Sequence, residues 1–258
     1  MSPVPLRRPA PILHIMDCLL APLLSPLLIA QALRLRARAL RLPEPPGPRR
    51  GELGRGPDLR LLILGDSSAA GVGTTHQEEA LSGQLATALS PNRRLIWQLE
   101  ARTGATSRST LTRLETLPRQ HFDIVLLVLG VNDVTSFAPL TRILADRAQI
   151  ARTLSDRFDA QKLIITGIPP LAQFHLLPNP LRWILGKRAA RLEQRLQQQA
   201  ERAGHLYLPF TMALTRDLMA EDGFHPSPRA YQHWAEALVP PLLETPLTTS
   251  GSSAPQES

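Results

Sequence analysis

Short apolar runs alternate along this chain with longer segments in which apolar residues recur at helical spacing. The runs are apolar enough to be covered on both faces, and they predict buried strands at 59–65, 94–101, 123–130 and 162–167. Helical periodicity predicts helices at 77–89, 108–119, 139–158, 181–203 and 228–243. This alternation predicts an α/β fold, a single three-layer, doubly wound domain with a mainly parallel sheet of about five strands and helices on both faces.

The edges of the predicted domain follow from changes in composition. The length of 258 residues suits one domain with tails, and the strand and helix pattern is confined to residues 59–244. Residues 43–58 are rich in Pro and Gly and predict a linker. Residues 245–258 are polar and of low complexity, which predicts a disordered tail.

Residues 1–42 form an N-terminal arm in which an apolar run, 11–33, precedes an arginine-rich segment. We favour an uncleaved arm that meets a membrane surface through residues 11–41, because leucines can enter the acyl boundary while arginines contact anionic head groups. These arginines are Arg34, Arg36, Arg38 and Arg41. A cleaved export signal and an amphipathic helix packed on its own domain stay open as alternatives. Positive charge opposes export, which favours a cytoplasmic location or a peripheral one at the inner membrane face.

The net charge of +7 does not indicate a nucleic-acid partner. Residues 1–60 hold +6 of it, so the predicted domain is nearly neutral and lacks the basic face that phosphate binding needs. Cys18 is the only cysteine, which excludes an intrachain disulfide. Cysteine and histidine are too sparse for a structural zinc site, so we expect no metal.

The first candidate for chemistry follows the first predicted strand. The segment LGDSSAAGVG (64–73) places Ser67 where a parallel strand gives way to a loop and helix. Function sits at the carboxyl ends of strands in such sheets, and N–H groups at a helix start can stabilise an oxyanion. The segment also fits a plain Gly/Ser turn or a phosphate-cradling loop, although GxxxxGK[ST] is absent.

Two later segments carry further polar groups in predicted loops. LGVNDVTS (129–136) places Asn132 at the end of the third predicted strand, where its amide can donate to an oxyanion or simply cap an Asx turn. AEDGFHPSPRAY (220–231) places Asp222 three residues before His225 in one loop. That spacing lets the carboxylate orient the imidazole as a general base, the alternative being a histidine in a surface turn.

Taken in order, these motifs resemble the SGNH hydrolases, also called the GDSL esterase/lipase family, over about residues 59–243. The resemblance implies a flavodoxin-like domain with Ser67 as nucleophile, His225 as base and Asp222 as its orienting acid. It also implies an oxyanion hole formed by the N–H groups of Ser67 and Gly104 and the amide of Asn132. Gly104 lies in the segment ARTGATS, and the residue after Gly-Asp-Ser is Ser68 where the family pattern has Leu.

The resemblance implies a serine hydrolase that cleaves carboxylic esters through an acyl-enzyme, with neither metal nor organic cofactor. We expect a small-molecule or lipid ester as substrate, lysophospholipids included if the arm binds membrane. The same triad could instead serve an acyltransferase or a carbohydrate deacetylase, and a non-catalytic phosphate- or nucleotide-binding protein is the alternative from another class. The apolar residues of 173–194 could wall an acyl pocket or pack as ordinary core.

Overall fold

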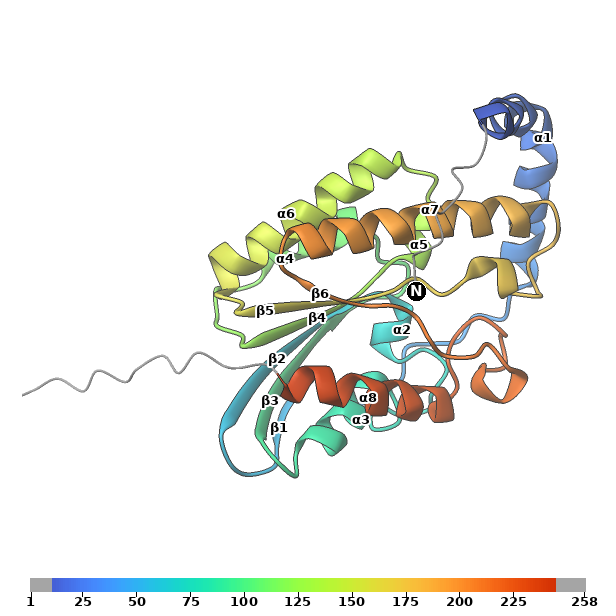
Figure 1. The fold of residues 1–258 in the computed structure, drawn as a ribbon. Coiled ribbons are helices and arrows are strands. Elements are labelled where there is room, and N and C mark those ends of the chain that lie inside the picture. Colours follow the sequence, from blue (N-terminus) through green and yellow to red (C-terminus); the bar gives the residue numbers. More distant parts are fainter. Residues whose placement is uncertain (1–10, 245–258) are drawn as a thin grey trace, which may run out of the picture.

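The computed structural model describes residues 11–244, with side chains described from residue 25 onward. Within that range six strands form one sheet, in the order β1-β3-β2-β4-β5-β6, with helices on both faces (Figure 1). The strands are β1 (Arg50–Leu53), β2 (Asp58–Gly65), β3 (Arg94–Ala101), β4 (Ile124–Val128), β5 (Lys162–Thr166) and β6 (Leu206–Leu208). The longer helices are α1 (Pro11–Arg38), α3 (Leu81–Leu89), α4 (Ser107–Thr116), α6 (Leu140–Phe158), α7 (Leu181–Arg202) and α8 (Pro228–Leu243). The short ones are α2 (Ser67–Ala70), α5 (Val131–Thr135), η1 (Leu171–Gln173) and η2 (Arg216–Leu218).

The sheet is parallel except at one end. β2 lies between β3 and β4 and pairs in parallel with both, so that Leu61 is in register with Trp97 and with Ile124. β5 and β6 continue in parallel beyond β4, whereas β1 is antiparallel to β3. The carboxyl ends of β2, β4 and β5 therefore meet along one edge, where the loops that carry the candidate residues begin.

Separate apolar cores lie on the two faces of the sheet. Helices α3 and α8 cover one face, where Leu85 and Leu238 are buried against the strands. Helices α4 and α6 cover the other, where Leu114 and Leu154 are buried, and α7 lies beside α6 (Figure 1). The predicted α/β, doubly wound, flavodoxin-like arrangement is confirmed, with six strands in place of about five.

The interpretation of residues 43–58 as a linker is wrong over much of its length. Residues 50–53 form β1, which pairs with β3 from Arg50 opposite Gln98 to Leu53 opposite Leu95. A strand at the end of a sheet makes hydrogen bonds on one side only, so it tolerates the Pro and Gly that surround it. The predicted tail, residues 245–258, lies outside the described residues.

The proline-rich segment before β1 is also held on the domain. Pro45 is buried, and its carbonyl accepts a hydrogen bond from the Gln77 side chain at 3.3 Å. The Glu44 carboxylate accepts one from the Thr103 N–H at 2.6 Å and forms an ion pair with Arg49. The chain that follows α1 is therefore fixed to the body of the protein.

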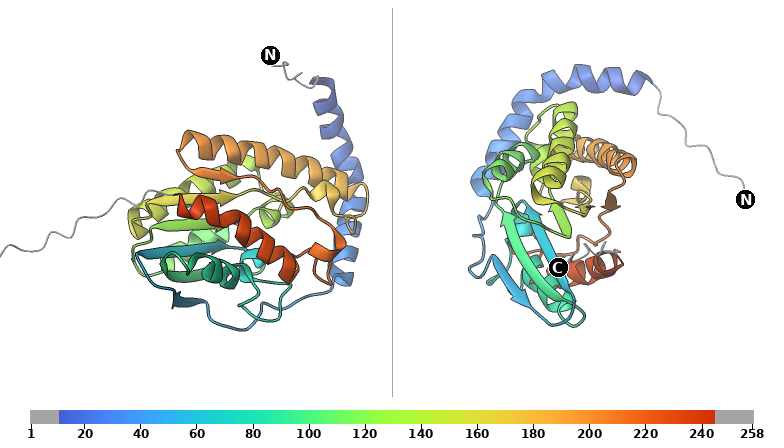
Figure 2. Two further views of the ribbon diagram at one scale, coloured as in Figure 1. Left: turned by 60° about the horizontal axis from the view of Figure 1, so that its bottom comes forward. Right: turned by 90° about the vertical axis from the view of Figure 1, so that its left-hand side faces the viewer.

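Helix α1 lies along one end of the domain near α7, and its N-terminal part extends beyond the body (Figure 2). Leu28 and Leu35 are partly buried against the apolar cluster of α7. The opposite face carries Ile29 and Leu33, whose exposed fractions are 59% and 63%. Along the part of the chain that the structure describes, the helices are too short or too polar to cross a membrane.

Candidate active site

Ser67 stands at the carboxyl end of the central strand β2, as the first residue of helix α2. Asp66 caps this helix, since its carboxylate accepts a hydrogen bond from the Ser68 N–H at 3.0 Å. The cap fixes the turn between strand and helix, so the Ser67 hydroxyl is presented at a helix start beside backbone N–H groups.

The carboxyl group of Asp66 is itself almost fully buried. Burial raises its pKa to about 6 from an ordinary value of 3.8, although the Ser68 N–H and the charges of His225 and Arg147 act to lower it. A carboxyl whose pKa is raised on folding stabilises the protein below its ordinary pKa and loses that contribution as the pH rises through its folded value. The stabilisation from Asp66 is therefore lost between about pH 4 and pH 6.

The segment before α8 forms a loop closed at its base. Met219 and Pro226 form an antiparallel bridge, and the Ala220 N–H donates to the His225 carbonyl at 2.8 Å. Within this loop, one oxygen of Asp222 accepts the N–H groups of Phe224 at 2.9 Å and His225 at 3.0 Å. The carboxylate thus fixes the backbone that carries the imidazole.

The structure brings Ser67, His225 and Asp222 into one chain of hydrogen bonds. His225 Nδ1 lies 2.5 Å from Asp222 Oδ2, and His225 Nε2 lies 2.8 Å from Ser67 Oγ. Because the carboxylate only accepts, Nδ1 carries the proton and Nε2 is free to accept the hydroxyl of Ser67. Burial acts to raise the pKa of Asp222, but the hydrogen bonds from His225 and Phe224 outweigh it and lower that pKa below its usual range.

Two contacts hold the serine loop against the histidine loop, which follows it by more than 150 residues. Gly73 has φ of 105°, and a Cβ at this position would lie 2.3 Å from the carbonyl oxygen of Pro226, so the backbones approach too closely for any side chain. The hydroxyl of Tyr231, a fully buried side chain on α8, donates to the Val72 carbonyl at 2.8 Å.

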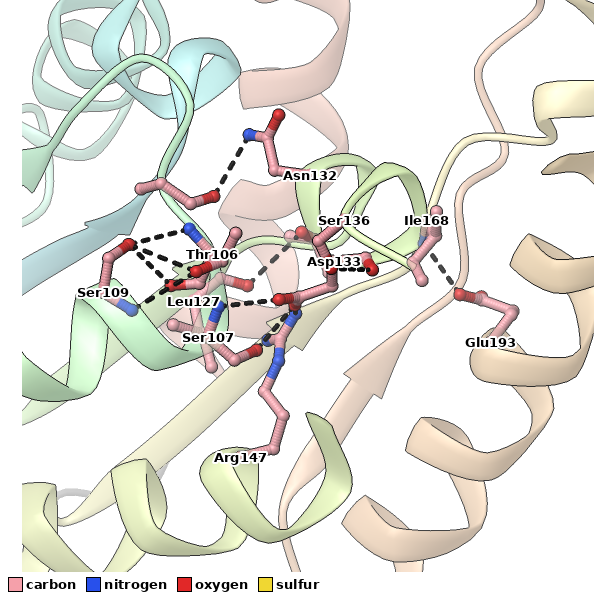
Figure 3. Close-up of polar contacts among 12 residues, drawn as sticks. Thr106, Ser107, Ser109, Leu127, Asn132, Asp133, Ser136, Arg147, Ile168 and Glu193 are labelled. Atoms are coloured by element: carbon pink, nitrogen blue, oxygen red, sulfur yellow. Dashed lines mark hydrogen bonds and ion pairs between the residues drawn. The ribbon is translucent and has the colours of Figure 1, made fainter. Parts of the chain in front are cut away.

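Asn132 lies on α5, just beyond β4, and borders the same cavity as Ser67. Its amide nitrogen donates to the carbonyl of Ala105 at 3.1 Å (Figure 3). An amide nitrogen carries two hydrogens, so a second donor is left for a ligand. Gly104 precedes Ala105 with φ of 81° but borders a neighbouring cavity, together with Gly65.

A buried polar network lies under α5, and it was not predicted from the sequence. Asp133 accepts hydrogen bonds from the Ser107 N–H at 2.8 Å and the Ser107 hydroxyl at 2.6 Å, and it pairs with Arg147 at 3.3 Å (Figure 3). Both charged side chains are 3% exposed. The signal was Arg147 itself, which falls on the apolar stripe of the predicted helix, in line with Ile143 and Ile150.

Ser67 opens into a cavity of about 390 Å³, a size typical of sites for small organic ligands. Its polar end includes Ser67, Asn132 and His225, and the rest is mostly apolar. From segment 173–194, Phe174 and Leu177 border the cavity and are also buried in the core cluster, so the two predicted roles coincide. Trp183 of the same segment is 46% exposed.

Comparison with known proteins relates this chain to one family. Residues 63–233 match the sequence model of the GDSL-like lipase/acylhydrolase family. The GDSL-like esterase Rv1075c of Mycobacterium tuberculosis is 29% identical over 196 residues, which cover 70% of this chain and 60% of that protein. The chain therefore spans less than two thirds of this curated relative.

Solved structures show the same fold. The esterase EstA from Pseudoalteromonas sp. is 22% identical with a TM-score of 0.56, over 72% of this chain and 96% of that one. A lipolytic protein of the G-D-S-L family from Veillonella parvula is 13% identical with a TM-score of 0.58, over 72% of this chain and all of that one.

The fold and the matched residues define a class of protein, the SGNH hydrolases. The chain belongs to the GDSL-like lipase/acylhydrolase family. The family predicted from the sequence is confirmed, and the enzyme class predicted, a hydrolase acting on ester bonds, is the class of that family.

Proposed function

We propose that this protein hydrolyses carboxylic esters through an acyl-enzyme on Ser67. The single observation that supports this most strongly is the 2.8 Å contact between Ser67 Oγ and His225 Nε2, with Asp222 on the far side of the imidazole. A hydroxyl paired with a base that is oriented by a third group is the arrangement of an activated nucleophile.

In the first step Ser67 Oγ attacks the ester carbonyl carbon while His225 Nε2 takes the hydroxyl proton. The tetrahedral intermediate collapses as the imidazolium returns that proton to the leaving alcohol, which breaks the ester bond and leaves the acyl group on Ser67. Water then attacks the acyl-enzyme with the same base, and the carboxylic acid leaves. Asp222 stabilises the imidazolium in both halves and stays ionised, in agreement with its lowered pKa.

The negative oxygen of the intermediate needs donors at the polar end of the cavity. We assign this role to the Ser67 N–H at the start of α2, to the second N–H of the Asn132 amide and to the Gly104 N–H. The first two belong to residues that border the Ser67 cavity. Support for Gly104 is indirect, because it comes through the hydrogen bond between Asn132 and its neighbour Ala105.

A membrane-facing role for the outer side of α1 forms a separate part of the proposal. Leu27 and Leu33 of α1 are 46% and 63% exposed, and Leu40, just beyond the helix, is 52% exposed. The exposed Arg34 and Arg38 lie among them. Leucines beside arginines suit the boundary of an anionic bilayer, which would bring lipid esters to the enzyme. Co-sedimentation with phosphatidylglycerol vesicles tests this: we expect binding that Arg34→Glu with Arg38→Glu weakens, and equal binding of both proteins would contradict it.

Labelling with a fluorophosphonate tests the nucleophile, because this reagent needs an activated serine. Ser67→Ala should lose both labelling and turnover of p-nitrophenyl acetate while keeping its folded circular dichroism spectrum. Ser68→Ala is the matched control, since Ser68 also borders the cavity, and it should keep both. Labelling of Ser67→Ala at the wild-type rate would show that another serine is the activated one and would overturn the assignment of Ser67. Absence of labelling in the wild type would favour a non-catalytic binding protein.

Acyl transfer by the same residues is separated from hydrolysis by the fate of the acyl group. Added alcohols or sugars compete with water for the acyl-enzyme, and their esters appear among the products if the enzyme transfers. We expect the free acid as the main product in the presence of such acceptors. Ester formation as the main reaction would make the protein an acyltransferase.

A further inference from the structure

We infer that helix α1 is one wall of the substrate cavity, and that Leu35 on this helix limits the length of the apolar chain that the ester can carry. The inference rests on the proposed ester hydrolysis at Ser67. It assigns to the N-terminal arm a role in substrate selection.

One face of α1 borders the cavity that contains Ser67. Ala32, Leu35 and Arg36 of α1 line it, together with Ala39 just beyond the end of the helix. The spacing of three and four residues between Ala32, Leu35 and Ala39 places them on the same side of the chain. Leu33, two positions before Leu35, is 63% exposed on the other side. Leu35 is therefore the largest apolar side chain that this stretch of the chain turns toward the cavity, and Arg36 beside it is the one charged residue there.

The wall continues without a break into the body of the protein. Leu35 packs against the apolar cluster that includes Leu171 of η1 with Leu181 and Leu185 of α7. Those three residues border the same cavity. An apolar chain attached to the ester would lie between α1 and α7, where each buried methylene strengthens binding by roughly fourfold.

Hydrogen bonds hold this part of α1 in place. The Gln31 side chain donates to the Asn179 carbonyl at 2.7 Å and accepts the N–H of Leu181 at 3.3 Å. Leu181 begins α7, so its N–H is one of the donors that a helix cannot satisfy internally, and no side chain of its own segment caps it. Beyond the helix, Glu44 and Pro45 are fixed to the domain as described above.

These contacts specify the kind of substrate. Most residues that line the cavity are aliphatic or aromatic, and on the α1 side Arg36 is the one charged exception. A mostly apolar wall of this kind disfavours sugar groups, because they would lose water without gaining hydrogen bonds for all their hydroxyls. We therefore assign esters with an apolar chain well longer than acetyl, carried on either the acyl or the alcohol side.

Leu35→Trp narrows the cavity, and Ala37→Trp is the control, because Ala37 is an exposed residue of the same helix that does not line the cavity. The full-length variants are assayed for kcat/KM on p-nitrophenyl esters from acetate to dodecanoate. A second series, of acetates of alkanols from butanol to decanol, places the chain on the alcohol side. We expect Leu35→Trp to lower kcat/KM for long chains at least tenfold in one series and to leave short esters within twofold. Ala37→Trp should match the wild type.

Leu35→Ala provides a second variant that folds with less strain and should shift the best chain length upward in the same series. Fluorophosphonate labelling of every variant reports the state of Ser67 independently of chain length. If labelling of the wild type fails, the proposed ester hydrolysis fails. If labelling is normal but Leu35→Trp and Leu35→Ala keep the wild-type chain-length profile in both series, the inference about α1 is overturned.

Discussion

Different kinds of interaction form the two ends of the Ser67 cavity, hydrogen bonds at one end and apolar packing at the other. At the polar end, Ser67, His225 and Asp222 are joined by directional hydrogen bonds of 2.5 and 2.8 Å, and loops fixed by further hydrogen bonds carry them. At the mostly apolar end, Ala32, Leu35 and Ala39 line the cavity beside Arg36, and the contacts of the three apolar side chains have no preferred angle. Displacing one atom at the polar end removes a proton acceptor, whereas a similar change at the apolar end alters only the available volume.

This difference predicts how each end responds to substitution. Substitutions at the polar end should lower kcat by orders of magnitude, and by the same factor for every substrate. Changes along α1 should be graded and should depend on the substrate. The following experiments are arranged from the largest expected effect to the smallest.

Asp222→Asn is expected to have the largest effect. An amide in place of the carboxylate favours the wrong tautomer of His225, and in serine hydrolases this costs about 10⁴-fold in kcat. Steady-state kinetics with p-nitrophenyl acetate and with a long-chain ester should show the same loss for both. Glu221→Gln, one residue earlier and exposed, is the control and should retain wild-type activity. A loss of activity toward only one of the two substrates would contradict the difference expected between the two ends of the cavity.

Asp133→Asn tests the buried network beneath α5. It leaves the Arg147 charge without its partner in a site where both side chains are 3% exposed, which should lower the free energy of unfolding by about 3–5 kcal/mol. Urea titration followed by circular dichroism measures the change. Adding Arg147→Met removes the orphaned charge and should restore part of the stability. A double variant no more stable than the single one would show that the pair itself contributes little.

Asn132→Ala should lower kcat by about 10²–10³-fold with a much smaller change in KM, because a donor to an oxyanion acts chiefly in the transition state. The effect should again be equal for short and long esters, which distinguishes it from a change at Leu35. Thr135→Ala, a residue of the same short helix that also borders the cavity, is the control. A rise in KM with kcat unchanged would assign Asn132 to ground-state binding.

Gln31→Ala should give the smallest effect, since it removes the two hydrogen bonds between α1 and the start of α7. Their loss should lower the stability of the docked part of α1 by about 1 kcal/mol, which amide hydrogen exchange across residues 28–38 measures directly. Arg34→Ala, on the exposed face, should leave exchange unchanged. Unaltered exchange in Gln31→Ala would show that apolar packing alone holds the helix.

The sequence predicted the regular part of this fold well because the signals there are local. The run 94–101 matches β3 at both ends, and the predicted helices agree with α3, α4, α6, α7 and α8 to within a few residues. The spacing of apolar residues along the chain directly indicates strands buried on both faces and helices with one apolar stripe. By contrast, β1 has four largely exposed residues and no apolar alternation, so only its pairing with β3 identifies it.

The candidate site shows the same division. The sequence predicted four site residues because each falls in a short loop motif whose residue types are typical of catalytic sites. They are Ser67, Asn132, Asp222 and His225. The contribution of α1 could not be predicted in this way. Its leucines surround the helix on several sides, so the sequence does not distinguish the face that packs from the face that is exposed. The position of Arg147 on an apolar stripe signals a buried charge, but only the structure identifies its partner, Asp133, fourteen residues earlier.

The pairing of β1 with β3 has a practical consequence for anyone who shortens this protein. Trimming the chain to the motif-bearing region at residue 59 would remove β1 and strip the outer side of β3 of its hydrogen-bonding neighbour. Unpaired backbone N–H and C=O groups of that kind can pair with strands of other molecules, which promotes aggregation. Truncated proteins that begin just before Pro43 lack α1 but keep β1. They therefore test the role of α1 without the loss of β1.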